Sequence, residues 1–226
     1  MSSPQSLPFK ASSLPAPPPA LASMGCSNIL GDKEASDEGH GTEEALQITK
    51  VLEDANITCC CVRISALIFY GAERLRPVCQ LGLLLLKMSS LTIHIMQDWE
   101  ICVPTDLVDK AAEVLQSESL SNEYCLVDPW AFPTTSLLHM YTRSKIKGVN
   151  FYFIIVPAND VHIVCEPSNL TQSSRGLPYP KLDVFIQSCL DMSNELMLSD
   201  VINGTNFTRT MGEDNFDLDG FSDAEG

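Results

Sequence analysis

The chain has 226 residues, 45% of them hydrophobic, and a formal net charge of −15. This length suits one medium domain with tails, which can bury a core without disulfides or structural metals. The acidic balance argues against DNA and anionic membrane surfaces as main partners, because both select for Lys and Arg. We therefore expect neither DNA binding nor membrane binding.

Composition divides the chain into three parts. Residues 1–41 are rich in Ser, Pro and Ala without an apolar period, which predicts a disordered arm. From Asp191 to Gly226 there are nine acidic residues and one basic residue, Arg209, so the middle of the chain is closer to neutral than the total suggests. We expect one domain over residues 42–200 and an acidic tail over residues 201–226.

Nine cysteines contain no Cys-x-x-Cys pair, and three of them, Cys59, Cys60 and Cys61, are consecutive. Adjacent strand residues face opposite sides, so these three cannot converge on one metal. Buried small hydrophobes in a reducing compartment are the favoured interpretation. With no secretory signal in the sequence, this predicts an intracellular protein, cytoplasmic or nuclear, that is not secreted.

The first predicted elements alternate helix and strand. Thr42 is a plausible N-cap for a helix whose apolar stripe is Ala45, Ile48, Leu52 and Ala55. Residues 57–62 form an apolar run of strand length. A second helix is expected from a Ser65 cap to about residue 70, where Gly71 ends it.

The second half predicts more strands. Residues 98–103 read as a strand, and Thr105 opens a helix. Residues 117–136 read as loop, residues 138–146 and 149–156 as a hairpin with its second strand central, residues 161–165 as a short strand and residues 179–192 as a closing helix. Together these elements predict an α/β (α+β) fold, with a mixed central β-sheet flanked by helices.

Two carboxylates provide the main candidate site. Asp98 and Glu100 are two residues apart on a predicted strand, so their side chains point to the same face. A carboxylate pair of this kind is typical of a divalent-cation site. We therefore assign Asp98 and Glu100 as candidate metal ligands and candidate catalytic residues.

An apolar segment, residues 78–97, separates this strand from the preceding helix. One hypothesis is a retained intron: Val-Cys can be encoded by a splice donor, Leu-Thr can contain a branch point, and Gln can end in an acceptor. Its twenty residues correspond to sixty nucleotides, which keeps the reading frame. The alternative is a genuine amphipathic insertion, such as a lid or a partner-binding helix.

With the segment removed, the chain resembles the fungal nucleotidyltransferase-fold proteins related to the nucleotidyltransferase-like component of abortive-infection systems. The resemblance spans roughly residues 43–220 and is carried by Ser-Ala-Leu-Ile-Phe-Tyr-Gly-Ala from Ser65, Asp-Trp-Glu-Ile-Cys-Val-Pro from Asp98, Lys-Gly-Val-Asn from Lys147, Cys-Glu-Pro-Ser-Asn from Cys165 and Leu-Pro-Tyr-Pro-Lys-Leu from Leu177.

This resemblance implies a magnesium site at Asp98 and Glu100 and places the phosphate-binding turn at Ser65. Arg63 and Arg74 are further candidate nucleotide-binding residues, with a solvent-facing arginine at the strand end as the favoured interpretation of Arg63. The resemblance also implies a nucleoside triphosphate as the bound partner. In active relatives a small-residue turn at a helix start holds the phosphates and three carboxylates hold magnesium.

The chain departs from the family pattern at two places. Arg63 and Ile64 replace an expected glycine pair, and residues 149–156 contain no third carboxylate. These departures favour a degenerate nucleotidyltransferase-fold protein that serves as a non-catalytic binding or regulatory module. The alternative is a magnesium-dependent nucleotidyltransferase that acts on a protein, RNA or small-molecule acceptor.

A weaker candidate is a basic strand face. Arg143, Lys145 and Lys147 alternate along the predicted hairpin and could bind phosphate. A solvated sheet face is the favoured interpretation.

Overall fold

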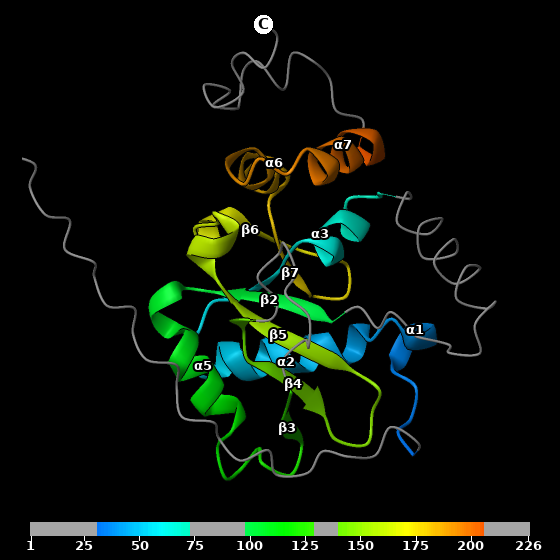
Figure 1. Cartoon of the computed structure of the whole chain (residues 1–226), viewed down its shortest axis with the longest axis vertical. Coiled ribbons are helices and arrows are strands. Elements are labelled where there is room, and N and C mark those ends of the chain that lie inside the picture. The colour runs from blue at the N-terminus through cyan, green and yellow to red at the C-terminus, as the bar shows by residue number, and fades with distance from the viewer. Residues whose placement is uncertain (1–30, 73–97, 129–139, 206–226) are drawn as a thin grey trace, which may run out of the picture.

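The computed structural model describes residues 31–72, 98–128 and 140–205. Its centre is a five-stranded sheet in the order β1-β2-β5-β4-β3 (Figure 1). The strands are β1 (Cys60–Cys61), β2 (Trp99–Val103), β3 (Tyr124–Val127), β4 (Arg143–Ile146) and β5 (Tyr152–Pro157). β2 and β5 run parallel, and the other neighbours are antiparallel. The predicted mixed sheet is confirmed, with β5 in its centre.

The helices lie around this sheet, and a small second sheet lies beside it (Figure 1). The α-helices are α1 (Ser36–Gly39), α2 (Thr42–Asp54), α3 (Ile64–Phe69), α5 (Val108–Leu115), α6 (Leu182–Asp191) and α7 (Glu195–Gly204). The 3-10 turns are η1 (Thr105–Leu107), η3 (Ala158–Val161) and η4 (Pro167–Asn169). The second sheet pairs β6 (Leu170–Gln172) with β7 (Pro178–Pro180).

One face of the main sheet forms the larger hydrophobic core. Alternate residues of β2 and β5 belong to it, among them Ile101 and Phe153, both fully buried. The apolar stripe of α2, which includes Ile48 and Leu52, belongs to the same core, as does Ala111 of α5. Because strand side chains alternate between faces, the residues between these positions point to the other side of the sheet.

The opposite face of the sheet changes from apolar to polar along its strands. At one end lies a second, smaller core that contains Cys60, Cys102 and Val156. Towards the other end of β2, the same alternation places Glu100 and Asp98 on this face. Both carboxylates are buried, so the candidate site on this strand is shielded from solvent.

Local backbone geometry corrects the expected ends of three helices. Gly41, with φ +78°, is the N-cap of α2, and Thr42 is the first helical residue instead of the cap. Ser65 lies inside α3, which follows Arg63. Tyr179 belongs to β7, where it pairs with Thr171, so α6 starts only at Leu182.

The structure also corrects two assignments of strand and loop. β3 lies inside the segment predicted as loop, because Tyr124 to Val127 pair with β4 at the sheet edge, a contact that local composition does not encode. The predicted strand over residues 161–165 is wrong. Val161 ends η3, and His162 has φ +49°, which turns the chain away from an extended path.

The described structure extends past both expected domain boundaries. Before residue 42, Asp32 forms an ion pair with Lys145, and Lys33 bridges to Val149. After residue 200, α7 continues to Gly204. The segment 78–97 lies outside the described residues.

None of the described helices is both long enough and apolar enough to cross a lipid bilayer.

Candidate functional site

The candidate site is built on β2. Asp98 directly precedes this strand and Glu100 is its second residue, so both side chains lie on one face, as predicted. Each residue is only 7% exposed. Buried carboxylates require partners, because an unpaired buried charge is strongly disfavoured.

Asp98 is paired with Arg143 of β4. Arg143 Nε lies 2.6 Å from Asp98 Oδ2, and Arg143 Nη2 lies 2.9 Å from Asp98 Oδ1. This is a two-pronged, charge-assisted contact of the kind that planar guanidinium groups make with carboxylates. The same guanidinium group lies over the Tyr152 ring, 4.3 Å from its centroid. Asp98 is therefore held by the chain itself, across β5.

Glu100 is paired less completely. Arg63 Nε lies 3.0 Å from Glu100 Oε2, yet this oxygen has no aligned hydrogen-bond donor among the described residues. Burial raises the pKa of Glu100 to about 7, the nearby Arg63 charge lowers it, and the nearby Asp98 charge raises it. Glu100 is thus a buried carboxyl group that titrates near neutrality, a property that is common at functional sites.

The backbone at Arg63 has a conformation that usually requires glycine. Its φ is 54° and its ψ is −119°, immediately before α3. These angles match the first central position of a type II′ turn, where Gly dominates. Arg63 thus occupies a turn position that glycine would usually fill, while its side chain reaches Glu100.

This conformation predicts a difference between two variants that both remove the guanidinium group. We expect Arg63→Gly to be more stable than Arg63→Ala by about 1 kcal/mol, because only glycine accepts this φ without strain. Urea denaturation of the two variants measures the difference. Equal stabilities would mean that Arg63 does not impose strain on the turn.

The strand beside the carboxylates supplies no third acid. Glu100 is opposite Ile154 in the parallel pair, so Tyr152, Ile154 and Val156 share this face. Asp160 lies beyond β5, where its Oδ2 accepts a hydrogen bond of 2.6 Å from the Tyr141 hydroxyl. Among the described residues, β5 therefore leaves the acidic pair without a third carboxylate on that strand.

Of the two other predicted nucleotide-binding residues, Ser65 and Arg74, the structure describes only Ser65. Ser65 lies half-buried in the first turn of α3. Arg74 lies outside the described residues. The turn before α3 thus contributes Arg63 to the site, through its ion pair with Glu100.

Two residues of the predicted basic face, Arg143 and Lys145, are paired inside the fold, and the third, Lys147, is exposed as a solvated face requires. Arg143 pairs with Asp98, and Lys145, which is 3% exposed, pairs with Asp32. Lys147 lies beyond β4, is exposed, and donates a hydrogen bond of 2.7 Å to the Ser121 carbonyl. The charges of Arg143 and Lys145 are therefore used to neutralise carboxylates inside the fold.

A sulfur cluster on the same sheet face was not predicted. The Sγ atoms of Cys60, Cys102 and Cys165 lie within 4.8 Å of one another, and all three residues are buried. Hydrogen bonding among these thiols lowers the pKa of Cys165 and raises the pKa of Cys60 and Cys102. Predicting this cluster from the sequence would require knowing that Cys60 lies opposite Cys102 in the β1–β2 pair, and this depends on the strand register.

Cys59 and Cys61 belong to the larger core on the other side of β1, while Cys60 belongs to the smaller core. The prediction that the three consecutive cysteines do not converge is confirmed.

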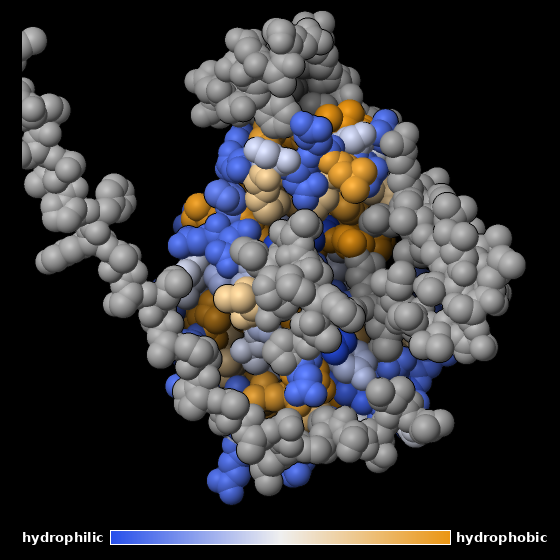
Figure 2. Space-filling view, viewed as in Figure 1, coloured by the Kyte–Doolittle hydropathy of each residue, from blue (hydrophilic) through white to orange (hydrophobic). Residues whose placement is uncertain are grey.

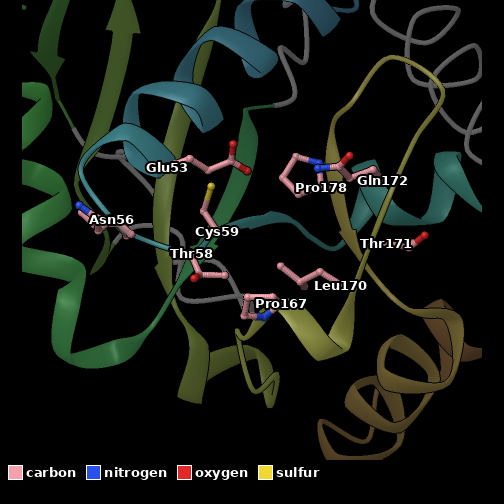
Figure 3. A pocket seen from close by; sticks show the side chains of 10 residues that line it. Glu53, Asn56, Thr58, Cys59, Pro167, Leu170, Thr171, Gln172 and Pro178 are labelled. Carbon is pink, nitrogen blue, oxygen red and sulfur yellow. The ribbon is translucent and has the colours of Figure 1, made fainter.

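A hollow of about 630 Å³, drawn in Figure 3, has neither Asp98 nor Glu100 among its lining residues. It is bounded by the end of α2, the segment leading into β1, and the second sheet. Its lining residues are Glu53, Asn56, Ile57, Thr58, Cys59, Pro167, Leu170, Thr171, Gln172 and Pro178. A second hollow of about 340 Å³ beside α5 also lacks Asp98 and Glu100.

Apolar side chains reach the surface at the end of the molecule formed by α6 and α7 (Figure 2). The exposed large residues there include Leu196, which is 73% exposed, and Ile202. Both residues belong to α7.

Comparisons of the chain with protein-family models, with curated proteins and with solved structures gave no significant match. The resemblance drawn from the sequence motifs therefore stays a prediction.

Proposed function

We propose that this chain is a degenerate nucleotidyltransferase-like protein that acts as a non-catalytic binding or regulatory module. The observation that carries this proposal is that both candidate metal ligands are paired with arginines of the same chain. Asp98 is paired with Arg143 and Glu100 with Arg63. A cation that entered the site would have to replace these ion pairs, and Mg²⁺ gives up its own water reluctantly.

The neighbouring strand supports the same proposal. Tyr152, Ile154 and Val156 of β5 face the carboxylate side, so this strand offers neither a third carboxylate nor another hard oxygen ligand at Ile154 and Val156. The Arg143 guanidinium group is stacked over Tyr152, which fixes it in place over the sheet. The local chemistry stabilises the fold at the position where an active relative would bind metal.

The second candidate is the magnesium-dependent nucleotidyltransferase, moving a nucleotidyl group from a nucleoside triphosphate to an acceptor. It is favoured by one observation. Two buried carboxylates lie close enough for the charge of Asp98 to raise the pKa of Glu100, and a divalent cation would relieve this repulsion. In that case Mg²⁺ would displace the arginines, which would then be free to contact phosphate.

Calorimetry separates the two functions. We expect Mg²⁺ titrated into the full-length protein to give no saturable heat, and ATP or GTP to bind no more tightly with Mg²⁺ than without it. The Asp98→Ala/Glu100→Ala double variant is the control for any binding seen. Because segment 78–97 lies outside the described residues, a form lacking Val78 to Gln97 is titrated in parallel.

Magnesium-dependent nucleotide binding that disappears in the double variant would contradict the non-catalytic proposal and support the enzyme. Nucleotide binding that is independent of Mg²⁺ and unchanged in the double variant would support a binding module and contradict the enzyme.

A further inference from the structure

The sulfur cluster is assembled from three separate segments. Cys60 is on β1, Cys102 is opposite it on β2, and Cys165 comes from the irregular segment between η3 and η4. Burial of a single cysteine is explained by its small apolar side chain. Hydrophobic burial alone does not require three sulfurs from three segments within 4.8 Å of one another.

The spacing fits a metal ion. Metal–thiolate bonds of about 2.3 Å place three sulfurs in a trigonal arrangement about 4 Å apart. The three Sγ atoms already lie within 4.8 Å of one another, so a small contraction would complete the site.

The positions of the three sulfurs are fixed by the surrounding fold. The β1–β2 ladder holds Cys60 and Cys102 in register. Cys165 Sγ lies 3.4 Å from the Thr58 carbonyl oxygen and 3.7 Å from the Cys102 carbonyl oxygen. The backbone next to Cys165 is also held in place. The Val164 carbonyl accepts hydrogen bonds from the Asn169 side chain and from the Glu166 amide.

The surroundings select the class of ion. The cluster lies in the smaller hydrophobic core with Val62, Ile154 and Val156, where water is excluded. Within the described part of the chain, no His, Asp or Glu joins the three sulfurs as a fourth ligand. Zn²⁺ strongly prefers four ligands, whereas soft thiolates without hard ligands suit Cu(I).

We propose that Cys60, Cys102 and Cys165 form a binding site for a soft, thiophilic metal ion, and that this ion is Cu(I) in three-coordinate thiolate geometry. Cys165 Sγ contacts the carbonyl oxygen of Thr58, and Thr58 also lines the hollow drawn in Figure 3. Solvent in this hollow therefore comes close to the Cys165 side of the cluster. The site uses none of the candidate magnesium ligands, so it stands or fails independently of the proposed function.

The test is an anaerobic titration of the reduced, full-length protein with Cu(I), supplied as its acetonitrile complex in competition with bicinchoninate. The test variants are Cys60→Ala, Cys102→Ala and Cys165→Ala. We expect each of them to bind one Cu(I) fewer than the wild type, or to bind Cu(I) at least about tenfold more weakly. The matched control is Cys61→Ala, because Cys61 is adjacent to Cys60, equally buried, and faces the other core. Its Cu(I) binding should equal that of the wild type.

Equal binding by all four variants and the wild type would overturn the proposal, as would an equal loss in Cys61→Ala. X-ray absorption of the wild type with one equivalent of copper gives a result that does not depend on any variant folding. A shell of three sulfurs supports the site, and a shell with two sulfurs or with nitrogen or oxygen ligands overturns it. Displacement of the bound Cu(I) by one equivalent of Zn²⁺ would also overturn the assignment of the ion.

Discussion

Asp98→Asn should lower the free energy of unfolding by about 3 kcal/mol, because it breaks a buried ion pair while leaving the Arg143 charge in place. The Asp98 side chain is 3% exposed and that of Arg143 is 17% exposed, so water replaces the lost contact poorly. The substitution preserves the shape of the side chain and removes its charge. Urea denaturation at neutral pH measures the change.

Two comparisons make this prediction specific. Asp37→Asn is the matched control, because Asp37 pairs with Arg175 at the surface, and we expect a much smaller change there. The Asp98→Asn/Arg143→Met double variant should lose less stability than the sum of the single variants, since it leaves no buried charge without its partner. Additive losses would show that Asp98 and Arg143 do not stabilise the fold as a pair.

The second large effect concerns the pH dependence of stability and depends on Glu100. Burial raises the pKa of this carboxyl from its ordinary value of 4.5 to about 7 in the folded protein. Between these two pH values the folded state keeps a proton that the unfolded state has lost. The stabilising contribution of the protonated carboxyl is therefore fully present below about pH 4.5 and is lost as the pH rises through about 7.

Glu100→Gln should remove this dependence, because the amide stays neutral at every pH. Relative to the wild type, we expect the variant to gain about 3 kcal/mol of unfolding free energy between pH 4.5 and pH 8. Urea denaturation of both proteins over this pH range measures the difference between their free energies of unfolding. The titration of all other groups contributes equally to both proteins and cancels in this difference. Glu113→Gln, at an exposed position of α5, is the control and should follow the wild type at each pH.

A constant difference between Glu100→Gln and the wild type across the range would mean that Glu100 titrates as an ordinary exposed carboxyl. In that case the Arg63 charge would offset the effect of burial on the pKa of Glu100. The two predictions together test whether the acidic pair is a structural charge cluster, as the proposed non-catalytic role requires.

Much of the fold could be read from local pattern. The stripe of Ala45, Ile48 and Leu52 predicted α2, and the apolar run of residues 149–156 predicted a central strand. The alternation of side chains along β2 placed Asp98 and Glu100 on one face. These features follow from the repeat of a single element, so they need no knowledge of its neighbours.

Other features depended on contacts between distant parts of the chain. β3 was missed because it becomes a strand through its edge pairing with β4. The predicted strand over residues 161–165 had the alternating burial of Ile163, Val164 and Cys165, yet these residues belong to no described strand. An alternating pattern of side chains shows which of them are buried. An extended segment becomes part of a sheet only when its backbone forms hydrogen bonds with a neighbouring strand.

The sequence by itself determined that this chain carries a carboxylate pair on a buried strand and lacks a third acid on the strand over residues 149–156. The tertiary structure decided that Arg63 and Arg143 neutralise that pair and that Cys165 joins Cys60 and Cys102. The physical reason is that the period of a strand is set by its own backbone, whereas ion pairs and sulfur contacts depend on sheet register and on how loops pack across it.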